Sequence, residues 1–235
     1  QTCALPIYFL VAYIGGVDKE EALEYLNNKD SVAAAYLSKK LEKTTQEAEE
    51  DVKPIVLEES QYLFFEDVPT AHLKARGISR TAADIYGIRY DAKKDSWIIP
   101  IRDPRTNQLW GWQEKGTRGR YFMNYPQGVK KGLSLFGYYS YKMSDKSSED
   151  DMKTILVESP LDVARLASVG YAGGVAAYGA YLTKNQLELL LEQKYLYVAL
   201  DNDDAGNMSA IEVKKWADAH NKPIWFFNYD TTDQK

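Results

Sequence analysis

The chain contains two acidic sites that each follow a run of apolar residues. Glu158 comes after residues 155–157, and Asp201 and Asp203 come after residues 197–200. Each run is typical of a buried strand, so each acid is predicted at a strand's carboxyl end, where ligands bind in open parallel sheets. Carboxylates gathered at such an edge repel one another unless a cation lies among them. The pattern therefore predicts a divalent-metal site and phosphate chemistry.

Each of these residues also has a purely structural interpretation. Asp is common at helix N-termini, so the sequence Asp-Asn-Asp-Asp-Ala-Gly at 201–206 also fits a turn followed by an N-cap. A lone Glu at a strand end is usually solvated, and Gly179 fits either a turn or a close approach of a nucleotide to the backbone. The shared placement of the acids at one predicted sheet edge favours the metal site.

Strands and helices are predicted to alternate through the second half of the chain. The predicted strands cover residues 154–158, 174–178, 195–200 and 223–227, and the predicted helices cover 160–169, 184–193 and 205–220. Short connections between them favour a parallel sheet with helices on its faces. Pro160 suits the first turn of its helix, and Thr183 suits an N-cap.

The preceding segment is predicted to combine helices with a β-hairpin. Two helices are expected within 69–90, the first ending at Gly77 and the second capped by Ser79, and the hairpin pairs 97–101 with 109–112. A polar, charged linker follows near residues 144–151. The expected domains are a helical tail with linker (1–50), an α+β subdomain (57–146) and an α/β domain (152–235).

Residues 115–142 contain basic side chains interleaved with aromatic rings and contain no acidic residue. Cations for phosphates and rings for base stacking together predict a nucleic-acid track. The alternative is a solvated face over core aromatics, which is favoured for most of the rings. The basic residues are Lys115, Arg118, Arg120, Lys130, Lys131 and Lys142, and the rings are Tyr121, Phe122, Tyr125, Phe136, Tyr138, Tyr139 and Tyr141.

The composition is that of a globular protein. Of the 235 residues 45% are hydrophobic, and the net charge of -5 excludes a chain that is basic throughout. No apolar run approaches the roughly 18 residues of a membrane span, so no membrane partner and a cytoplasmic location are expected. The single cysteine, Cys3, excludes an internal disulfide framework and a cysteine-cluster zinc site. The first few residues, which include Ala-Leu-Pro-Ile at 4–7, are predicted to be an artefact joined to a truncated gene, so whether residues 1–8 are native stays open.

Three motifs in order resemble the Toprim domain, which primases, topoisomerases and some nucleases and recombination proteins share. They are Val-Glu-Ser-Pro-Leu-Asp at 157–162, Tyr178-Gly179, and the acidic motif at 201–206. The flanking segments resemble DnaG-like primases. Residues 73–79 resemble the Leu-x-x-Arg-Gly-Ile signature, 99–103 with 111–112 resemble the hairpin, 120–137 resemble the basic segment, and 8–26 resemble the tail of a zinc ribbon. Lys115 replaces the arginine of Gly-Phe-Gly-Gly-Arg, keeping the charge without the bidentate fork.

This resemblance implies an α/β fold, with a primase-like α+β subdomain before a C-terminally truncated Toprim parallel sheet. It implies a nucleotidyltransferase that makes RNA primers on single-stranded DNA for replication. The implied partners are the template, nucleoside triphosphates, the RNA primer and a replicative helicase, in a bacterial or phage-infected cell. Mg²⁺ or Mn²⁺ is the implied cofactor, with zinc confined to an upstream domain.

The resemblance also assigns roles to individual residues. Glu158, Asp201 and Asp203 are the expected catalytic and metal-binding residues, and Glu158 is either a ligand or a general acid/base. The expected nucleotide- and template-binding residues are Arg76, Lys115, Arg118, Arg120, Asn124, Lys130, Lys131 and Gly179. The alternatives are another Toprim phosphotransferase, such as an OLD-type nuclease or a topoisomerase fragment, and a non-catalytic Toprim DNA-binding module.

Overall fold

The computed structural model describes residues 53–118, 121–144, 152–179 and 181–228. The chain divides into two compact units, Gln1–Lys53 and Pro54–Lys235. Every described residue except Lys53 belongs to the second unit. The predictions for residues 1–50, including the zinc-ribbon tail, lie outside the described residues, and the three predicted domain boundaries stay predictions.

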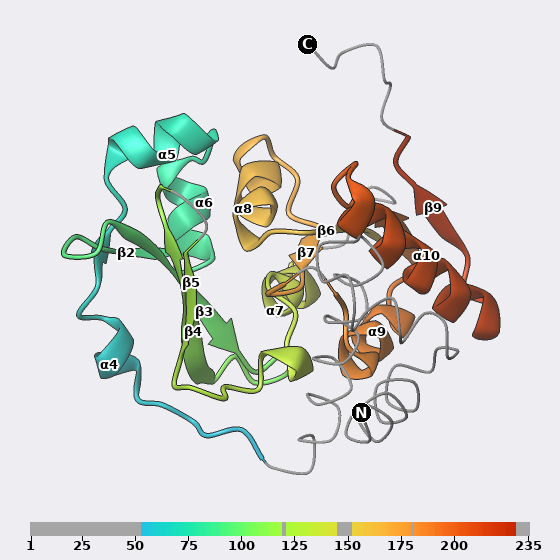
Figure 1. Cartoon of the computed structure of the whole chain (residues 1–235), viewed down its shortest axis with the longest axis horizontal. Coiled ribbons are helices and arrows are strands. Elements are labelled where there is room, and N and C mark those ends of the chain that lie inside the picture. The colour runs from blue at the N-terminus through green and yellow to red at the C-terminus, as the bar shows by residue number, and fades with distance from the viewer. Residues whose placement is uncertain (1–52, 119–120, 145–151, 180, 229–235) are drawn as a thin grey trace, which may run out of the picture. The chain divides into compact units, whose positions relative to one another are not determined.

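The first part of the second unit is built on a five-stranded antiparallel sheet, in the order β1-β2-β3-β4-β5 (Figure 1). The predicted hairpin is confirmed as β3 and β4, which pair antiparallel from end to end. Because β4 extends to Gly116, four residues beyond the predicted strand, it also pairs with β5, which forms one edge of the sheet. The strands are β1 (Glu66–Asp67), β2 (Arg89–Asp91), β3 (Ser96–Arg102), β4 (Leu109–Gly116) and β5 (Phe122–Tyr125).

Short helices accompany this sheet: α4 (Glu59–Tyr62), α5 (Thr70–Arg76) and α6 (Arg80–Ile85). The predicted N-cap is confirmed, because the Ser79 side chain accepts a hydrogen bond from the backbone N–H of Ala82 at 3.1 Å. The prediction of helix as far as residue 90 is wrong. Gly87 adopts a left-handed φ of 63°, which breaks the helix and turns the chain into β2.

The second part contains the parallel sheet, in the order β7-β6-β8-β9. All three strand pairs are parallel, which confirms the predicted architecture. The strands β6 (Lys153–Val157), β7 (Gly174–Ala176), β8 (Tyr195–Val198) and β9 (Ile224–Phe226) end one or two residues earlier than predicted. Their helices are α8 (Pro160–Ser168), α9 (Lys184–Leu191) and α10 (Asp204–Ala219), and the 3₁₀ helix η1 (Lys131–Leu133) and α7 (Tyr138–Met143) precede them.

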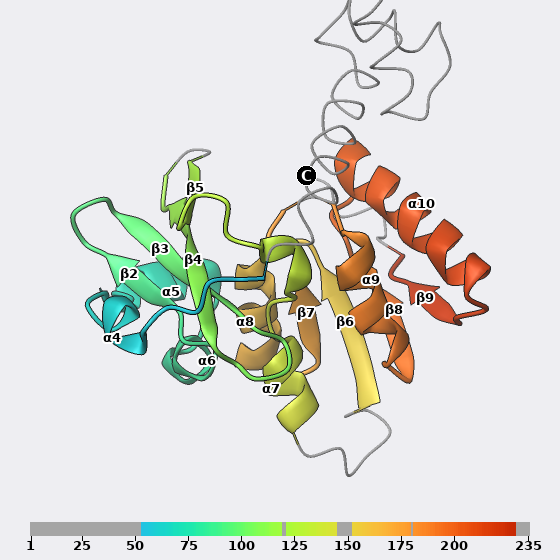
Figure 2. The same cartoon turned by 90° about the horizontal axis from the view of Figure 1, so that it is seen from below.

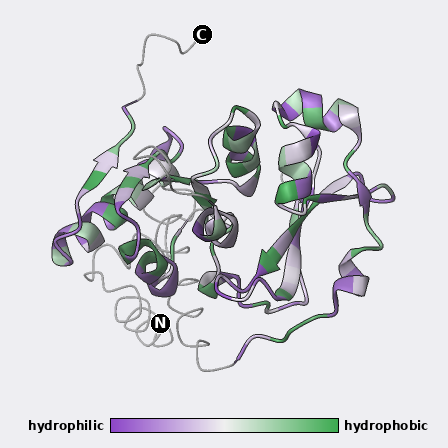
Figure 3. Cartoon of the chain, turned by 180° about the vertical axis from the view of Figure 1, so that it is seen from behind, coloured by the Kyte–Doolittle hydropathy of each residue, from purple (hydrophilic) through white to green (hydrophobic). Residues whose placement is uncertain are grey.

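The two faces of the parallel sheet pack into different cores. Val157 and Ala176 share one apolar cluster with helix α8 and with residues of the first sheet, among them Ile99. Leu156 and Val198 face the other way, into a cluster with α9 and α10. Figure 2 shows α8 lying between the two sheets, and Figure 3 shows helices that carry both polar and apolar residues. Helix α8 therefore joins the sheets through a shared core.

Within the ranges that the structure describes, no helix is long and apolar enough to cross a membrane.

Candidate active site

Glu158 and Asp201 lie at the same edge of the parallel sheet. Strand β6 ends at Val157, immediately before Glu158, and β8 ends at Val198, shortly before Asp201. These strands are hydrogen-bonded neighbours in which Leu156 lies opposite Val198. The carboxyl ends of both strands, and the acids that follow them, are therefore at the edge where open α/β sheets bind ligands.

Asp203 caps helix α10. Its Oδ1 accepts a hydrogen bond from the backbone N–H of Gly206 at 2.8 Å, so the capping interpretation of this residue is confirmed. A Cβ added to Gly206 would lie 2.0 Å from the carbonyl oxygen of Asp201, so the turn admits only glycine there. A cap engages one carboxylate oxygen, which is compatible with metal ligation by the other.

Lys115 is the basic side chain that faces these acids from the antiparallel sheet. Its Nζ lies 3.5 Å from Oγ of Ser159, the N-cap of α8. Burial lowers the pKa of Lys115, and the nearby positive charge of Arg76 lowers it further. Acting in the opposite direction are the carboxylates of Asp162, Asp201 and Glu158. The ammonium group is therefore within electrostatic range of acids that follow both strands.

Asp162 belongs to this site although the sequence-based assignment did not include it. It lies in the first turn of α8, four residues after Glu158. Burial raises the pKa of the Asp162 carboxyl, and the charge of Asp201 raises it further, against the opposing effect of Lys115 and Arg76. The spacing in the sequence could have indicated this residue. When a helix starts directly after a strand, the residues of its first turn lie close to the carboxyl end of that strand.

The donor set at this edge fits Mg²⁺ or Mn²⁺. Carboxylate oxygens are the ligands that these ions prefer. In the described part of the chain, no group of three or more His, Cys, Asp or Glu side chains is arranged to hold an ion by itself. Protein-bound Mg²⁺, however, is usually held by one or two carboxylates together with substrate phosphates and waters. A cation would also relieve the repulsion between Asp162 and Asp201.

Three of the expected binding residues lie around the backbone carbonyl of Tyr178: Asn124, Lys131 and Gly179. Nε2 of Gln113 donates to this oxygen at 2.9 Å and to Oδ1 of Asn124 at 3.3 Å, and Nζ of Lys131 donates to the same carbonyl at 3.4 Å. Gln113 was not predicted, because nothing local indicates that a strand residue reaches across to another sheet. A Cβ at Gly179 would meet Nζ of Lys131 at 3.7 Å, an ordinary contact, so crowding does not require glycine at this position.

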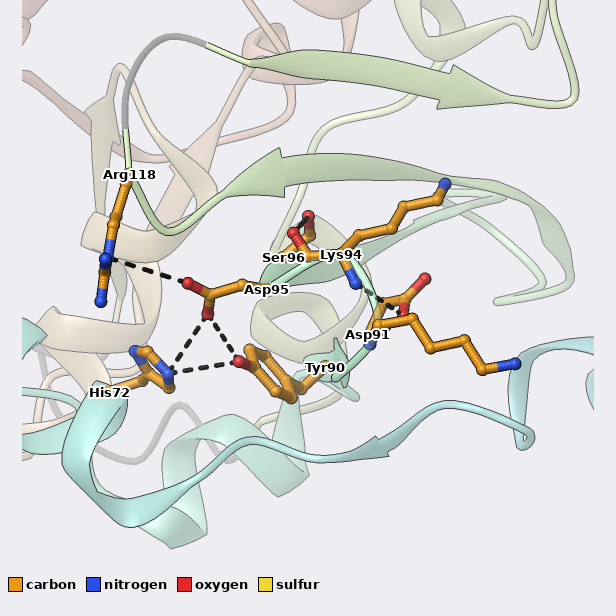
Figure 4. A network of polar contacts seen from close by, with 8 residues as sticks. His72, Tyr90, Asp91, Lys94, Asp95, Ser96 and Arg118 are labelled. Carbon is orange, nitrogen blue, oxygen red and sulfur yellow. Dashed lines mark hydrogen bonds and ion pairs between the residues drawn. The ribbon is translucent and has the colours of Figure 1, made fainter.

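Arg118 lies in the loop between β4 and β5, and its side chain is 93% exposed. Its Nε lies 4.0 Å from Oδ2 of Asp95, whose Oδ1 accepts a hydrogen bond from the Tyr90 hydroxyl at 2.6 Å (Figure 4). Nε2 of His72, from helix α5, lies 3.5 Å from the same Oδ1. The network connects the start of this loop to β2 and to α5, the helix that carries Arg76.

The expected binding residues therefore separate into groups. Arg76 and Lys115 come close to the acids, whereas Arg118 is paired with Asp95. Lys130 is the N-cap residue of η1. Arg120 lies outside the described residues.

Comparison with known proteins finds one matching family model and several similar proteins. Residues 155–233 match the family model described as Toprim-like. The chain is 38% identical over 114 residues to the DNA primase of Aquifex aeolicus, an alignment that covers 46% of this chain and 22% of that protein. It is 29% identical over 150 residues to a DNA primase of Neisseria meningitidis, covering 62% and 24%. The chain thus spans less than a quarter of the length of these relatives.

Solved structures show the same fold. The DnaG primase catalytic domain bound to single-stranded DNA aligns with a TM-score of 0.61 at 18% identity, over 74% of this chain and 70% of that chain. The zinc-binding and RNA polymerase domains of Aquifex aeolicus primase align with a TM-score of 0.61 at 19% identity, over 96% and 64%. These alignments confirm the predicted fold class, an α/β fold with a parallel sheet after an α+β part.

Proposed function

We propose that this chain, a Toprim-domain relative of the bacterial DnaG-like primases, contains the catalytic core of a DNA primase. The reaction is the synthesis of an RNA primer on single-stranded DNA. The 3′-hydroxyl of the growing primer attacks the α-phosphate of a nucleoside triphosphate, and pyrophosphate leaves. The enzyme is on this proposal a nucleotidyltransferase.

The observation that carries the proposal is the position of Lys115. This lysine comes from the antiparallel sheet, yet its charge acts on acids that follow two strands of the parallel sheet. A nucleoside triphosphate with a bound metal ion needs both kinds of group, because basic side chains bind its phosphates and carboxylates bind its metal ion. A phosphate group at this place would be held by Lys115 and Arg76 on one side and, through the metal ion, by the acids on the other.

The metal-binding role is assigned to Glu158, Asp201 and Asp203. When bound there, Mg²⁺ or Mn²⁺ supplies neutralisation of the charge that develops on the phosphates. Lys115 and Arg76 donate hydrogen bonds to phosphate oxygens and orient the α-phosphate. Glu158 serves either as a ligand or as the group that accepts the proton of the attacking hydroxyl.

The decisive substitution is Asp203→Asn. Asn caps a helix about as well as Asp, so this variant keeps the hydrogen bond to Gly206 and should unfold at the wild-type temperature. It lacks the negative charge, and we expect primer synthesis from ribonucleotides on single-stranded DNA with Mn²⁺ to fall on the order of a hundredfold. Asp203→Ala should lose the cap as well, at about 1 kcal/mol of stability.

A matched control is Asp218→Asn, the same change at the other end of α10, where the carboxylate pairs with Lys214 at the surface. It should synthesise primers at the wild-type rate. Wild-type activity in Asp203→Asn would refute the metal-binding role of this residue. Metal-dependent cleavage of plasmid DNA, with no ribonucleotide incorporation, would instead identify a Toprim nuclease.

The finer expectations rest on the same proposal. Single-stranded DNA, nucleoside triphosphates and the primer are the expected ligands, with Arg118, Arg120, Asn124, Lys130, Lys131 and Gly179 assigned to contact nucleotide or template. A replicative helicase is the expected protein partner. The expected setting is the cytoplasm of a bacterial or phage-infected cell.

A further inference from the structure

Most of the aromatic rings between residues 115 and 142 are either buried or exposed, and Tyr139 is intermediate. Phe136, Tyr138 and Tyr141 are 4%, 1% and 2% exposed, so the core interpretation is confirmed for these rings. Tyr121, Phe122 and Tyr125 are 39%, 56% and 49% exposed. The exposed rings all lie on or beside β5, the edge strand next to the candidate active site.

Among these exposed rings, the strand register places Phe122 on the face that looks toward the site. Phe122 lies directly opposite Lys115 on β4, and Asn124 lies opposite Gln113. Side chains that are directly opposite in an antiparallel pair share one face of the sheet. Lys115 reaches Ser159 from this face. Phe122 therefore lies on the face of the antiparallel sheet that is turned toward the acids.

Tyr121 and Tyr125 belong to the other face. Tyr125 stacks on Trp112 with ring centroids 4.3 Å apart, and Trp112 packs against Phe65 in a separate apolar cluster. The hydroxyl of Tyr121 lies 3.9 Å from Sδ of Met123, and Met123 alternates with Phe122 along the strand. Phe122 is therefore the ring, among the three exposed ones, that is available on the site's face.

One cation lies beside the Phe122 ring on the β4–β5 hairpin. Nζ of Lys115 lies 5.4 Å from the ring centroid. An exposed ring beside a cation is an arrangement that binds a single strand, because a base stacks on the ring and the cation attracts the backbone phosphates. A protein partner with an apolar surface would not be favoured beside this charge, whereas a polyanion is.

We propose that Phe122 is a stacking platform for a base of single-stranded DNA, on the face of the sheet that also carries Lys115. This inference deepens the proposed primase function, because it assigns the template strand to the β5 edge of the active site. It predicts binding that depends on the presence of a base and on the ring, without dependence on metal or nucleotide.

The test compares a fluorescent oligo-dT with an abasic oligonucleotide of the same length, by anisotropy without metal or nucleotide. Phe122→Leu should weaken the binding of oligo-dT about tenfold, the scale of losing one base–ring stack, and should leave the binding of the abasic strand unchanged. Phe122→Tyr keeps a ring and should bind oligo-dT as the wild type does. Tyr121→Leu, an exposed ring removed from the other face, is the matched control and should have no effect.

Several outcomes overturn the proposal. They are unchanged binding of oligo-dT by Phe122→Leu, an equal loss for the two oligonucleotides, and a change confined to the KM for nucleoside triphosphate. A wild-type urea midpoint for Phe122→Leu establishes that the variant is folded. If the wild type synthesises primers but its DNA binding does not depend on Phe122, this inference is refuted and the proposed function is not. If DNA binding depends on Phe122 but the wild type makes no primers, the proposed function is refuted and this inference is not.

Discussion

Substituting Gln113 tests the contact between the two sheets at the site. The side chain is 4% exposed, and its Nε2 donates across to the Tyr178 carbonyl at 2.9 Å and along the sheet to Asn124 at 3.3 Å. Leucine has a similar volume and no donor, so Gln113→Leu removes these hydrogen bonds with little change in packing. The Tyr178 carbonyl would keep only its longer contact with Lys131, at 3.4 Å.

The size of the effect follows from these distances. A buried acceptor that loses its partner costs about 1–3 kcal/mol. Because Lys131 still donates to the same carbonyl, we expect the lower part of that range, about 1–2 kcal/mol. In a unit of this size that lowers the melting temperature by roughly 3–6 °C. Since Asn124, Lys131 and Gly179 adjoin this carbonyl, the KM for nucleoside triphosphate should rise as well.

The assay is urea unfolding of the full chain, followed by tryptophan fluorescence, with calorimetry for the melting temperature. Gln108→Leu is the matched control, because Gln108 lies on the same hairpin and is exposed. A surface change of this kind should stay within about 0.5 kcal/mol of the wild type. If Gln113→Leu unfolds at the same urea concentration as Gln108→Leu, the amide does not hold the two sheets together and the reasoning is refuted.

Buried phenols and one buried carboxylate give two more predictions. Burial raises the pKa of Tyr62 and of Tyr178, so their contribution to stability is complete below the unfolded pKa of about 10 and is lost as the pH rises above it. In a pH titration followed by tyrosinate absorbance, these two tyrosines should therefore ionise only when circular dichroism shows that the chain unfolds. Complete ionisation of all tyrosines near pH 10 (about the unfolded pKa) in a chain that is still folded would contradict this. Glu114 is 6% exposed and accepts a hydrogen bond from the half-exposed Lys94 at 2.7 Å. After a discount for solvent screening, Lys94→Met should cost about 1–2 kcal/mol in urea unfolding, and Glu114→Met in the same chain should restore most of it, because the stranded carboxylate is gone; a double variant as unstable as Lys94→Met would disprove this.

Helix starts and the alternation of strands and helices could be predicted from local sequence. The N-cap at Thr183, Pro160 at the first turn of α8, and the N-cap at Ser79 were all visible from residue type and position. The strand ends were less accurate, because an apolar run continues past the last ladder hydrogen bond. Ala199 and Leu200 are apolar and yet follow β8. Burial of those residues produces the same pattern as a strand does.

The active site itself could be predicted only in part, for a physical reason. Glu158 and Asp201 were placed together because the carboxyl ends of neighbouring parallel strands share an edge, and that rule needs only the order of elements. Lys115 lies 44 positions from Ser159, and the packing of the two sheets around α8 determines their contact. No local period of the sequence specifies that packing.

The sequence by itself therefore determined the alternation of strands and helices, the caps, and the acids at one sheet edge, since each depends on residues a few positions apart. Only the tertiary structure decided which cation faces those acids, which rings are buried, and that Gln113 holds Tyr178 and Asn124 together. These properties depend on the distance between segments remote in sequence, and burial in a shared core fixes that distance.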